Sequence, residues 1–577
     1  GNRGMGFYWK LALTNLKKNR RVYLPYLLSS AGIILMFYTI CALGPGIDQT
    51  AMYGGTSVAS VMGLGQFVIG LFAVLFLFYT NSFIIKRRKK ELGLYNILGM
   101  EKRHIAKILF RETLITACVS LILGLGLGIL FSRGMFWLLG VILGTSLPIT
   151  FVIPASAVTT TLVLFGIIFL LTLLYNLLQV TLAKPIELLH GGEQGEKEPK
   201  AHWILAIMGA LLLGAGYYMA VTITSPLDAL LFFFVAVLLV ILGTYLLFIT
   251  GITALLKLLK KNKNFYYKTN HFTAISGMLF RMKQNAAGLA SICVLFTALL
   301  VTVSTTFSLY TSMDGLLRAR YPRNILMSSQ AANEAAKEMI RSAVKEESEK
   351  LGLTIENVID RESWNITMAR ADNSFSTSSE SYSSTYAIAE VFTQSEFQRF
   401  SGQDVTLGEN QILLFDPAGT FPKSNTLKIN GKEFEIVTSS YQFPDASTVA
   451  QIYESYCMVV KDEKIIEQFL PSDSMLLGPN YSYDFDIAGN DPQDIKAMAE
   501  ALNTRTFSGD GIEYEYLYFE DSATSREEFM SLYGGLFFLG MFLGVLFLLG
   551  TALIIYYKQV SEGYEDAKRF SIMQKVG

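Results

Sequence analysis

The chain has 577 residues, of which 51% are hydrophobic and only 17% charged, and its 48 basic residues balance 48 acidic ones. This composition is typical of membrane proteins and excludes a soluble multidomain enzyme, and we expect no nucleic-acid partner. The four cysteines form no CxxC pair and the four histidines lie beside apolar runs, so we expect neither a disulfide framework nor a metal site.

The N-terminal segment FYWKLALTNLKKNRR mixes apolar and basic side chains. We expect residues 5–21 to form an amphipathic helix on the inner face of the membrane. Eight apolar runs follow that are long enough to cross a bilayer. They are residues 22–43, 58–85, 108–131, 155–180, 202–221, 229–256, 287–312 and 530–557. We therefore place spans one to four in residues 22–200, spans five to seven in 201–312 and span eight in 529–577.

The connectors between these runs alternate in charge. Residues 86–107 and 257–283 are rich in lysine and arginine, whereas the loops 44–57, 132–153 and 222–228 contain one basic residue, Arg133. By the positive-inside rule the basic connectors are cytoplasmic. The prediction is a multi-pass protein of the cell membrane with a cytoplasmic N-terminus.

Residues 313–528 form a polar segment between spans seven and eight, long enough to have a core of its own. TLKINGKEFEIV alternates around Asn430-Gly431 as in a β-hairpin, while AANEAAKEMIRSAVKEESEK and DPQDIKAMAEALN read as helices, the latter capped by Asp491. The fold class is thus an α-helical polytopic membrane protein with one α+β extracellular domain. This domain holds 18 Lys and Arg against 36 Asp and Glu, a net charge of −18. We expect its serine-rich residues 374–386 to form a mobile loop or irregular edge.

Few features of the chain suggest chemistry of its own. GGEQGEKE, at 191–198, lacks the hydroxyl residue of a phosphate-binding loop, and the sequence predicts no catalytic, metal-binding or substrate-binding residue. Arg111 and Glu112, at the inner edge of span three, are expected to snorkel, and the Gly124 and Gly128 pair to pack helices. The near-absence of intramembrane carboxylates disfavours a proton-driven carrier, so energy must come from a partner.

A short element recurs after two apolar runs. KKELGLYNILGM, at 89–100, and AKRFSIMQKVG, at the end of the chain, align when Gly99 is set on Gly577, which also pairs Tyr79 with Tyr557. An interfacial helix on lipid headgroups would explain the lysines. A partner-docking surface better explains the glycines, which permit close backbone approach. We expect Lys90, Glu91, Leu92, Gly93, Leu94, Tyr95, Leu98 and Gly99 in the first copy, and Lys568, Arg569, Phe570, Ile572 and Gly577 in the second, to contact this partner.

RRKKELGLYNILGM resembles the cytoplasmic motif of FtsX/MacB-like ABC transporter permeases. KPIELL at 184–189 and SGMLFRMKQNAAGLASI at 276–292 are similar to the bacitracin-resistance, BceB-like branch. The resemblance implies a coupling helix at 86–104 that docks on a separate ATPase subunit, present in two copies, which carries the ATP and magnesium. This chain would need no cofactor. It also implies ten helices, two of them after Gly577. Arg569 stands where Glu91 stands in the first copy, so the two docking surfaces are expected to differ.

The same resemblance implies the function. The chain would be a permease subunit that confers resistance to bacitracin-type or lantibiotic-type peptides by removing them from lipid-linked wall precursors, and that also works with a membrane histidine kinase. An alternative is an FtsX-like signalling or mechanotransmission module that controls wall enzymes, and another is lipoprotein or drug export. Seven spans precede the outer domain here, whereas FtsX-like permeases have one, so the span count favours the BceB-like branch.

Overall fold

The computed structural model describes residues 2–47, 54–144, 152–182, 200, 202–223, 226–330, 333–377, 385–437, 443, 453–470, 478–505, 507 and 517–576. These form two compact units. The first, which we call the membrane unit, comprises residues 1–221, 233–311 and 530–577. The second comprises 222–232 and 312–529, and we call it the outer unit after the side of the membrane that the sequence predicts for it. KPIELL at 184–189 and GGEQGEKE at 191–198 lie outside the described residues.

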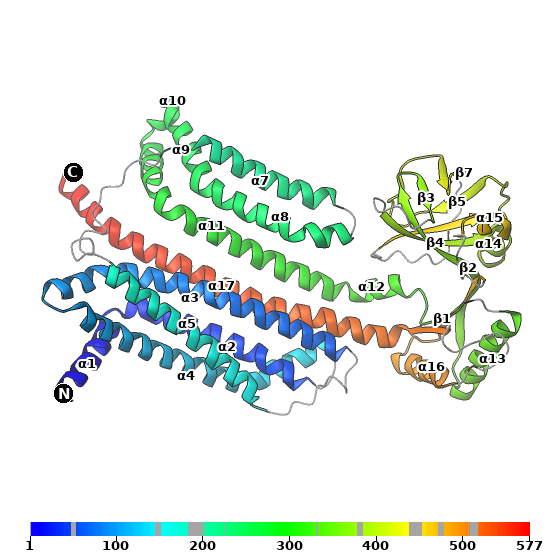
Figure 1. Ribbon diagram of the computed structural model, residues 1–577, viewed down its shortest axis with the longest axis horizontal. Helices are drawn as coiled ribbons and strands as arrows, with labels where there is room; N and C mark the ends of the chain where they lie inside the picture. The colour runs from blue at the N-terminus through cyan, green and yellow to red at the C-terminus, as the bar shows by residue number, and fades with distance from the viewer. Residues whose placement is uncertain are drawn as a thin grey trace. The chain divides into compact units, whose positions relative to one another are not determined.

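The membrane unit is helical, and its helices fall where the apolar runs predict them (Figure 1). Eight helices among the described residues are long and apolar enough to cross a bilayer, which confirms the expected fold class. The helices are α1 (Asn2–Lys18), α2 (Arg20–Gly46), α3 (Gly55–Ile97), α4 (Lys102–Leu143), α5 (Ala155–Leu182), α7 (Trp203–Thr222), α8 (Pro226–Leu246), the π-helical η1 (Leu247–Gly251), α9 (Ile252–Lys261), α10 (Lys263–Tyr266), α11 (Thr269–Thr311) and α17 (Ser522–Val576).

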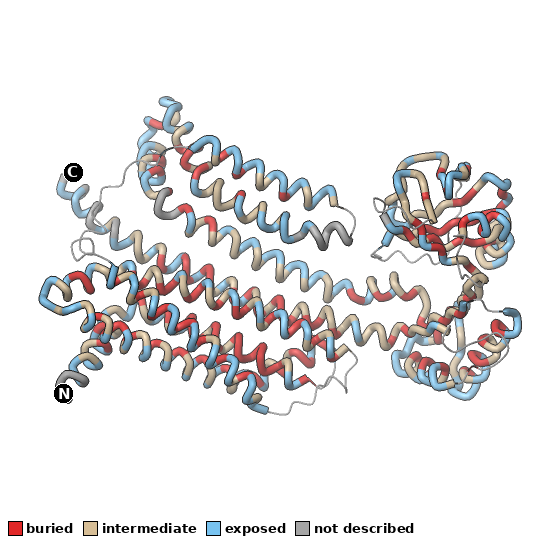
Figure 2. The backbone as a smooth tube through the Cα atoms, viewed as in Figure 1, coloured by how far each residue is buried: buried red, intermediate tan, exposed pale blue. Residues whose placement is uncertain are grey.

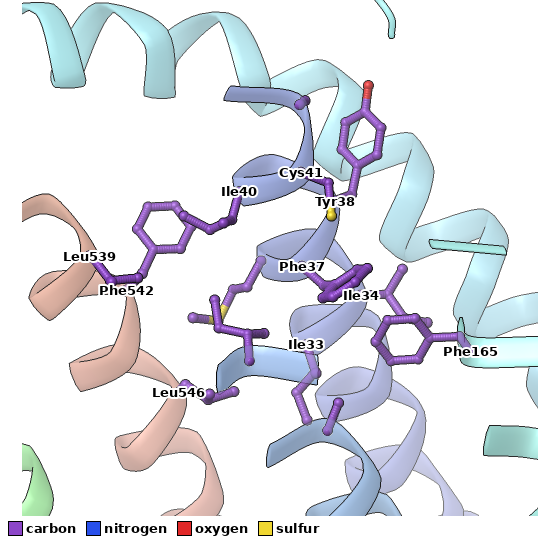
Figure 3. Packing of buried hydrophobic residues seen from close by; sticks show 14 of the residues in the cluster. Ile33, Ile34, Phe37, Tyr38, Ile40, Cys41, Phe165, Leu539, Phe542 and Leu546 are labelled. Carbon is purple, nitrogen blue, oxygen red and sulfur yellow. The ribbon is translucent and has the colours of Figure 1, made fainter. Parts of the chain in front are cut away.

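Helix α2 forms the centre of the main core of the membrane unit, and most of its C-terminal two-thirds is buried (Figure 2). Figure 3 shows its Phe37 facing Phe165 of α5, while Leu539, Phe542 and Leu546 approach from α17. Helix α4 packs closely on another side of α2. A Cβ atom on Gly124 would lie 2.5 Å from Ile34, and one on Gly128 would lie 2.8 Å from Tyr38. The two glycines thus let α2 and α4 approach, which confirms their predicted packing role.

The predicted coupling helix at 86–104 is not a separate element. Helix α3 continues without a break from its apolar part to Ile97, and α4 begins at Lys102. The lysine-rich sequence is compatible with helix, so it simply prolongs α3 until Gly99 interrupts it. The segment is therefore a helical hairpin made of the inner ends of α3 and α4.

The outer unit contains a four-stranded antiparallel sheet in the order β10–β1–β9–β2. Its strands are β1 (Ile325–Ser329), β2 (Ile355–Ala371), β9 (Asn480–Ile487) and β10 (Leu517–Asp521). Helices α13 (Glu334–Leu351) and α16 (Pro492–Thr504) share one apolar core with this sheet, and α12 (Met313–Arg320) precedes β1. The chain order β-α-β-β-α-β with this strand order is the ferredoxin-like arrangement. Asp491 caps α16 as predicted, accepting a hydrogen bond from the Gln493 amide.

A second lobe is inserted between β2 and β9. It consists of β3 (Ser374–Ser376), β4 (Thr385–Thr393), α14 (Gln394–Ser401), β5 (Gln411–Phe415), β6 (Thr426–Ile429), β7 (Lys432–Ile436), β8 (Glu454–Val460) and α15 (Glu463–Glu467). The second half of β2 pairs with both β3 and β4, which closes the ring β2–β3–β6–β7–β5–β8–β4 around an apolar core. The lobe is thus a small closed barrel.

Two local expectations fall in this barrel. The Asn430-Gly431 hairpin is confirmed, because both residues have positive φ and Ile429 pairs with Lys432. The expected irregular segment 374–386 is partly wrong. Residues 374–376 form β3, which pairs with β2 and β6, and residue 385 begins β4. Residues 378–384 of that segment lie outside the described part of the chain.

Candidate functional site

The turn between α3 and α4 is a regular helix C-cap. The Met100 amide donates to the Tyr95 carbonyl (3.0 Å) and the Gly99 amide to the Asn96 carbonyl (3.1 Å), with Gly99 at φ +96°. This is the hydrogen-bond pattern of a Schellman motif, which places glycine in the left-handed conformation. Nothing lies within 4 Å of a Cβ built on Gly99. Gly99 therefore serves the backbone turn of the hairpin, and its expected contact with a partner stays a prediction.

The predicted docking residues divide between two sides of the hairpin. Leu92 is fully buried and packs with Ile85, Ile105, Leu109 and Val180, and Gly93 is buried as well. Leu92 therefore belongs to the packing among α3, α4 and α5, and its expected place on an exposed face is wrong. Helical periodicity turns a different set outward: Leu94, Ile97 and Leu98 are 48%, 53% and 73% exposed, and Lys90 is exposed beside them. We call these four residues the hairpin face.

Two lysines of the hairpin bind the inner end of α5. Lys89 Nζ donates to Gln179 Oε1 (2.8 Å), and Lys102 Nζ donates to the Thr181 carbonyl (2.6 Å). Positive charge near a helix C-terminus is favourable because the last carbonyls carry partial negative charge. These lysines therefore fasten the hairpin to α5.

Behind the hairpin lies a buried ion pair that the sequence analysis missed. Arg88 of α3 and Glu112 of α4, each about 3% exposed, form a bidentate pair in which Arg88 Nη1 and Nη2 donate to the two carboxylate oxygens. Glu112 is thus buried and paired, and the expected snorkelling is wrong for it. Its neighbour Arg111 is half-buried, and its guanidinium lies over the rings of Tyr8 and Trp9. A clue was available, since Glu112 interrupts the apolar run KILFRETLITACV.

Polar groups from the first two helices complete this arrangement. Asn15 Nδ2 of α1 donates to Glu112 Oε1 (3.1 Å), and Arg88 Nη1 donates to Tyr23 Oη of α2 (3.0 Å). Glu91 accepts from Tyr95 Oη (3.1 Å), from Asn19 Nδ2 (3.3 Å) and, at 3.4 Å, from Arg88 Nε. We call these seven residues the inner network: Asn15, Asn19, Tyr23, Arg88, Glu91, Tyr95 and Glu112. It joins α1, α2, α3 and α4 directly behind the hairpin face, and its two carboxylates share one guanidinium.

A small cavity of about 30 Å³, lined by both polar and apolar side chains, adjoins this network inside the α2–α5 bundle. Its lining includes Glu112, Asn81 and Asn176, and the two asparagines exchange a pair of hydrogen bonds of 2.8 and 3.0 Å. A cavity of this size has room for about two water molecules.

The second copy of the element lies near the end of α17, and its surroundings differ. Phe570 and Ile572 are 59% and 55% exposed, so the residue aligned with buried Leu92 is itself exposed. The Arg87 guanidinium lies 3.9 Å from the centre of the Tyr564 ring, and Tyr557 Oη donates to the Val22 carbonyl (2.7 Å). The side chains of Lys568 and Arg569, and Gly577, lie outside the described residues.

The outer unit has buried acid on its central strand. Asp484 and Asp486 are 8% and 5% exposed, and Asp486 accepts hydrogen bonds from the Asn324 amide (2.9 Å) and from Asn357 Nδ2 (3.0 Å). Asp484 accepts from the Met327 amide (3.2 Å). Burial raises the pKa of Asp484 to about 7, because desolvation disfavours the carboxylate more than Arg361 and the Met327 amide favour it. No group of three His, Cys, Asp or Glu suited to a metal ion occurs within the described ranges.

Comparison with known proteins points to one family. Residues 64–183, which include most of α3, the hairpin, α4 and α5, match the family described as FtsX-like permease C-terminal. Over 98% of this chain and 87% of the relative, the sequence is 22% identical to the bacitracin export permease protein BceB of Bacillus subtilis (strain 168). It is 24% identical to BceB of Halalkalibacterium halodurans over the same shares. The uncharacterized ABC transporter permease YvcS of B. subtilis is 27% identical over 55% of this chain, and this match spans about half (49%) of YvcS.

Proposed function

We propose that the chain is the permease subunit of an ABC transporter and that it docks an ATPase subunit through the hairpin face. Support comes from its FtsX-like domain and from its similarity to BceB permeases along nearly all of its length. In this proposal the ATPase chain, in two copies, binds ATP and magnesium, and the permease converts hydrolysis into removal of bacitracin-type or lantibiotic-type peptides from lipid-linked wall precursors. A membrane histidine kinase would receive the same peptide signal.

The observation that carries the proposal is an exposed apolar face on a rigid base. Leu94, Ile97 and Leu98 lie at the turn, beyond the apolar run of α3 and beside the basic residues that mark the cytoplasmic side. The Schellman turn and the inner network fix their backbone, so a partner that buries them orders few additional residues on binding. Phe570 and Ile572 of α17 supply a second exposed apolar pair.

The double variant Leu94→Asp/Leu98→Asp tests this docking. Both side chains point outward, so the fold should persist, whereas two carboxylates placed in an apolar interface should lower ATPase co-purification by 10-fold or more, on the order of 1.4 kcal/mol or above. Leu258→Asp, at a 47% exposed position of α9, is the matched control for adding acid to another apolar surface. Leu92→Asp is unsuitable because it would place a charge in the packed interior. Normal recovery of the ATPase with the double variant would refute the docking site.

The substrate is tested in cells. Deleting the transporter from its native host and challenging the cells with a panel of wall-active peptides should sensitise them selectively to peptides that bind lipid-linked precursors. Sensitivity restored by the intact chain, and not by the Leu94→Asp/Leu98→Asp variant, would link the phenotype to docking. Unchanged sensitivity with altered cell separation would instead favour an FtsX-like module that controls wall enzymes.

The orientation follows from charge. The cytoplasmic assignment of the hairpin makes residues 313–528 extracellular, and their net charge of −18 suits an outer domain that attracts cationic peptides. Acid that merely keeps the domain soluble would explain the same count, so the salt dependence of peptide association decides between the two.

A further inference from the structure

The alignment of the two repeated elements extends to the residue that anchors each of them. With Gly99 set on Gly577, Arg88 falls on Asp566 and Glu91 on Arg569. A cation and an anion three residues apart in the first copy thus become an anion and a cation in the second. This reversal keeps the i, i+3 spacing at which helical side chains are neighbours.

Arg88 and Asp566, which are aligned with each other, each form an ion pair with a residue of another helix. Arg88 of α3 pairs with Glu112 of α4, and Asp566 of α17 pairs with Arg281 of α11. The second pair is less buried, with Arg281 37% and Asp566 16% exposed. In each copy the residue at this position therefore ties the inner end of one long helix to a neighbour, with opposite polarity.

Arg281 lies in SGMLFRMKQNAAGLASI, which forms part of α11. Helices α11 and α17 also meet at their other ends. A Cβ on Gly540 would clash with Thr306, one on Gly544 would approach Val303, and the Tyr310 and Phe537 rings stack with centres 5.1 Å apart. The two helices are thus packed closely near Thr306 and tied by an ion pair near Arg281. A displacement of the inner end of α17 would pull on α11 through that pair.

We propose that Arg281 and Asp566 are the positioning pair of the second docking element, the charge-reversed counterpart of Arg88 and Glu112, and that they transmit ATPase movements from α17 to α11. This proposal rests on the docking of an ATPase at the inner segments. Because Phe570 and Ile572 lie one and two turns beyond Asp566, the pair holds the base of the element and leaves its exposed side chains available to the partner.

The test is a charge exchange in the permease–ATPase complex. Arg281→Asp and Asp566→Arg each place two like charges together, whereas Arg281→Asp/Asp566→Arg restores an ion pair with reversed polarity. We expect each single variant to retain the ATPase but to lose roughly 3- to 10-fold of its permease-stimulated hydrolysis. The exchanged pair should return to within about twofold of the unaltered complex. Lys261→Asp, at an exposed position of α9, controls for the loss of inner positive charge.

Each outcome decides the matter. Unaltered hydrolysis in both single variants, or an exchanged pair no better than the weaker single variant, would overturn the positioning role. If the single variants fail to give a monodisperse protein, the exchanged pair decides, because a recovered fold without recovered hydrolysis also overturns it. An unaltered chain that retains no ATPase would refute the proposed function and this inference with it. Retained ATPase with hydrolysis insensitive to the single variants would refute this inference alone.

Discussion

Replacement of Arg88 by methionine should destabilise the membrane unit strongly. Methionine fills a similar volume but leaves the Glu112 carboxylate buried without its cation. Of the side chains in the inner network, Asn15 would still donate a hydrogen bond to this carboxylate. Breaking a buried ion pair by removing one partner costs about 3–5 kcal/mol, because the other charge stays desolvated and unpaired. At roughly 2–4 °C per kcal/mol for a cooperative unit of this size, the melting temperature should fall on the order of 10 °C.

The assay is thermal unfolding of the detergent-solubilised chain, followed by size-exclusion chromatography of the folded fraction. Arg111→Met is the matched control, since Arg111 adjoins Glu112 in sequence but is only half-buried and lies outside the inner network. The double variant Arg88→Met/Glu112→Leu should recover much of the loss, because apolar replacement of both partners of a buried pair is often neutral. If Arg88→Met melts with the Arg111→Met control, or if the double variant melts as low as Arg88→Met, the inner network does not hold these helices together.

Three further predictions concern other parts of the chain. The pKa of Asp484 is about 7, against 3.8 ordinarily, so the folded outer unit holds this proton more tightly than the unfolded chain does. The free energy of unfolding of this unit should therefore fall by up to about 4 kcal/mol as the pH rises from 4 to 7. Asp484→Asn should flatten this pH dependence in denaturant titrations, and an unchanged pH dependence would contradict the burial argument. Gly124→Ala should cost about 1–3 kcal/mol because its Cβ would meet Ile34, whereas Gly126→Ala, where nothing lies within 4 Å, should be neutral or stabilising in the same melting assay; equal melting temperatures would argue against close α2–α4 packing. In stopped-flow measurements with isolated residues 313–528, the association rate of a cationic wall-active peptide should fall steeply with salt concentration, while that of a neutral analogue stays constant. The reason is that salt screens the attraction, over a Debye length of about 8 Å at physiological ionic strength. Salt-insensitive rates for both peptides would leave solubility as the reason for the acidity.

The lengths and composition of the apolar runs determined the architecture of the membrane unit. Eight apolar runs specified eight helices because the hydrocarbon thickness demands about 20 apolar residues, whatever their neighbours are. The Asn-Gly hairpin and the α16 cap were equally local, since the backbone conformation of Asn430 and Gly431 and the hydrogen bond of Asp491 depend on adjacent residues. The placement of Gly124 and Gly128 also followed from local spacing.

Tertiary structure decided which side of the hairpin is buried. The sequence KKELGLYNILGM shows helical periodicity, but Leu92 and Leu94 look equivalent until α4 and α5 cover one of them. Glu112 looked like an edge residue because its partner Arg88 is 24 positions away on another helix, and no local pattern reports such a pair. The closed barrel likewise depends on β2 pairing on both sides with strands that follow it, which is a non-local choice. Long-range packing thus selects among faces and partners that local periodicity leaves equivalent.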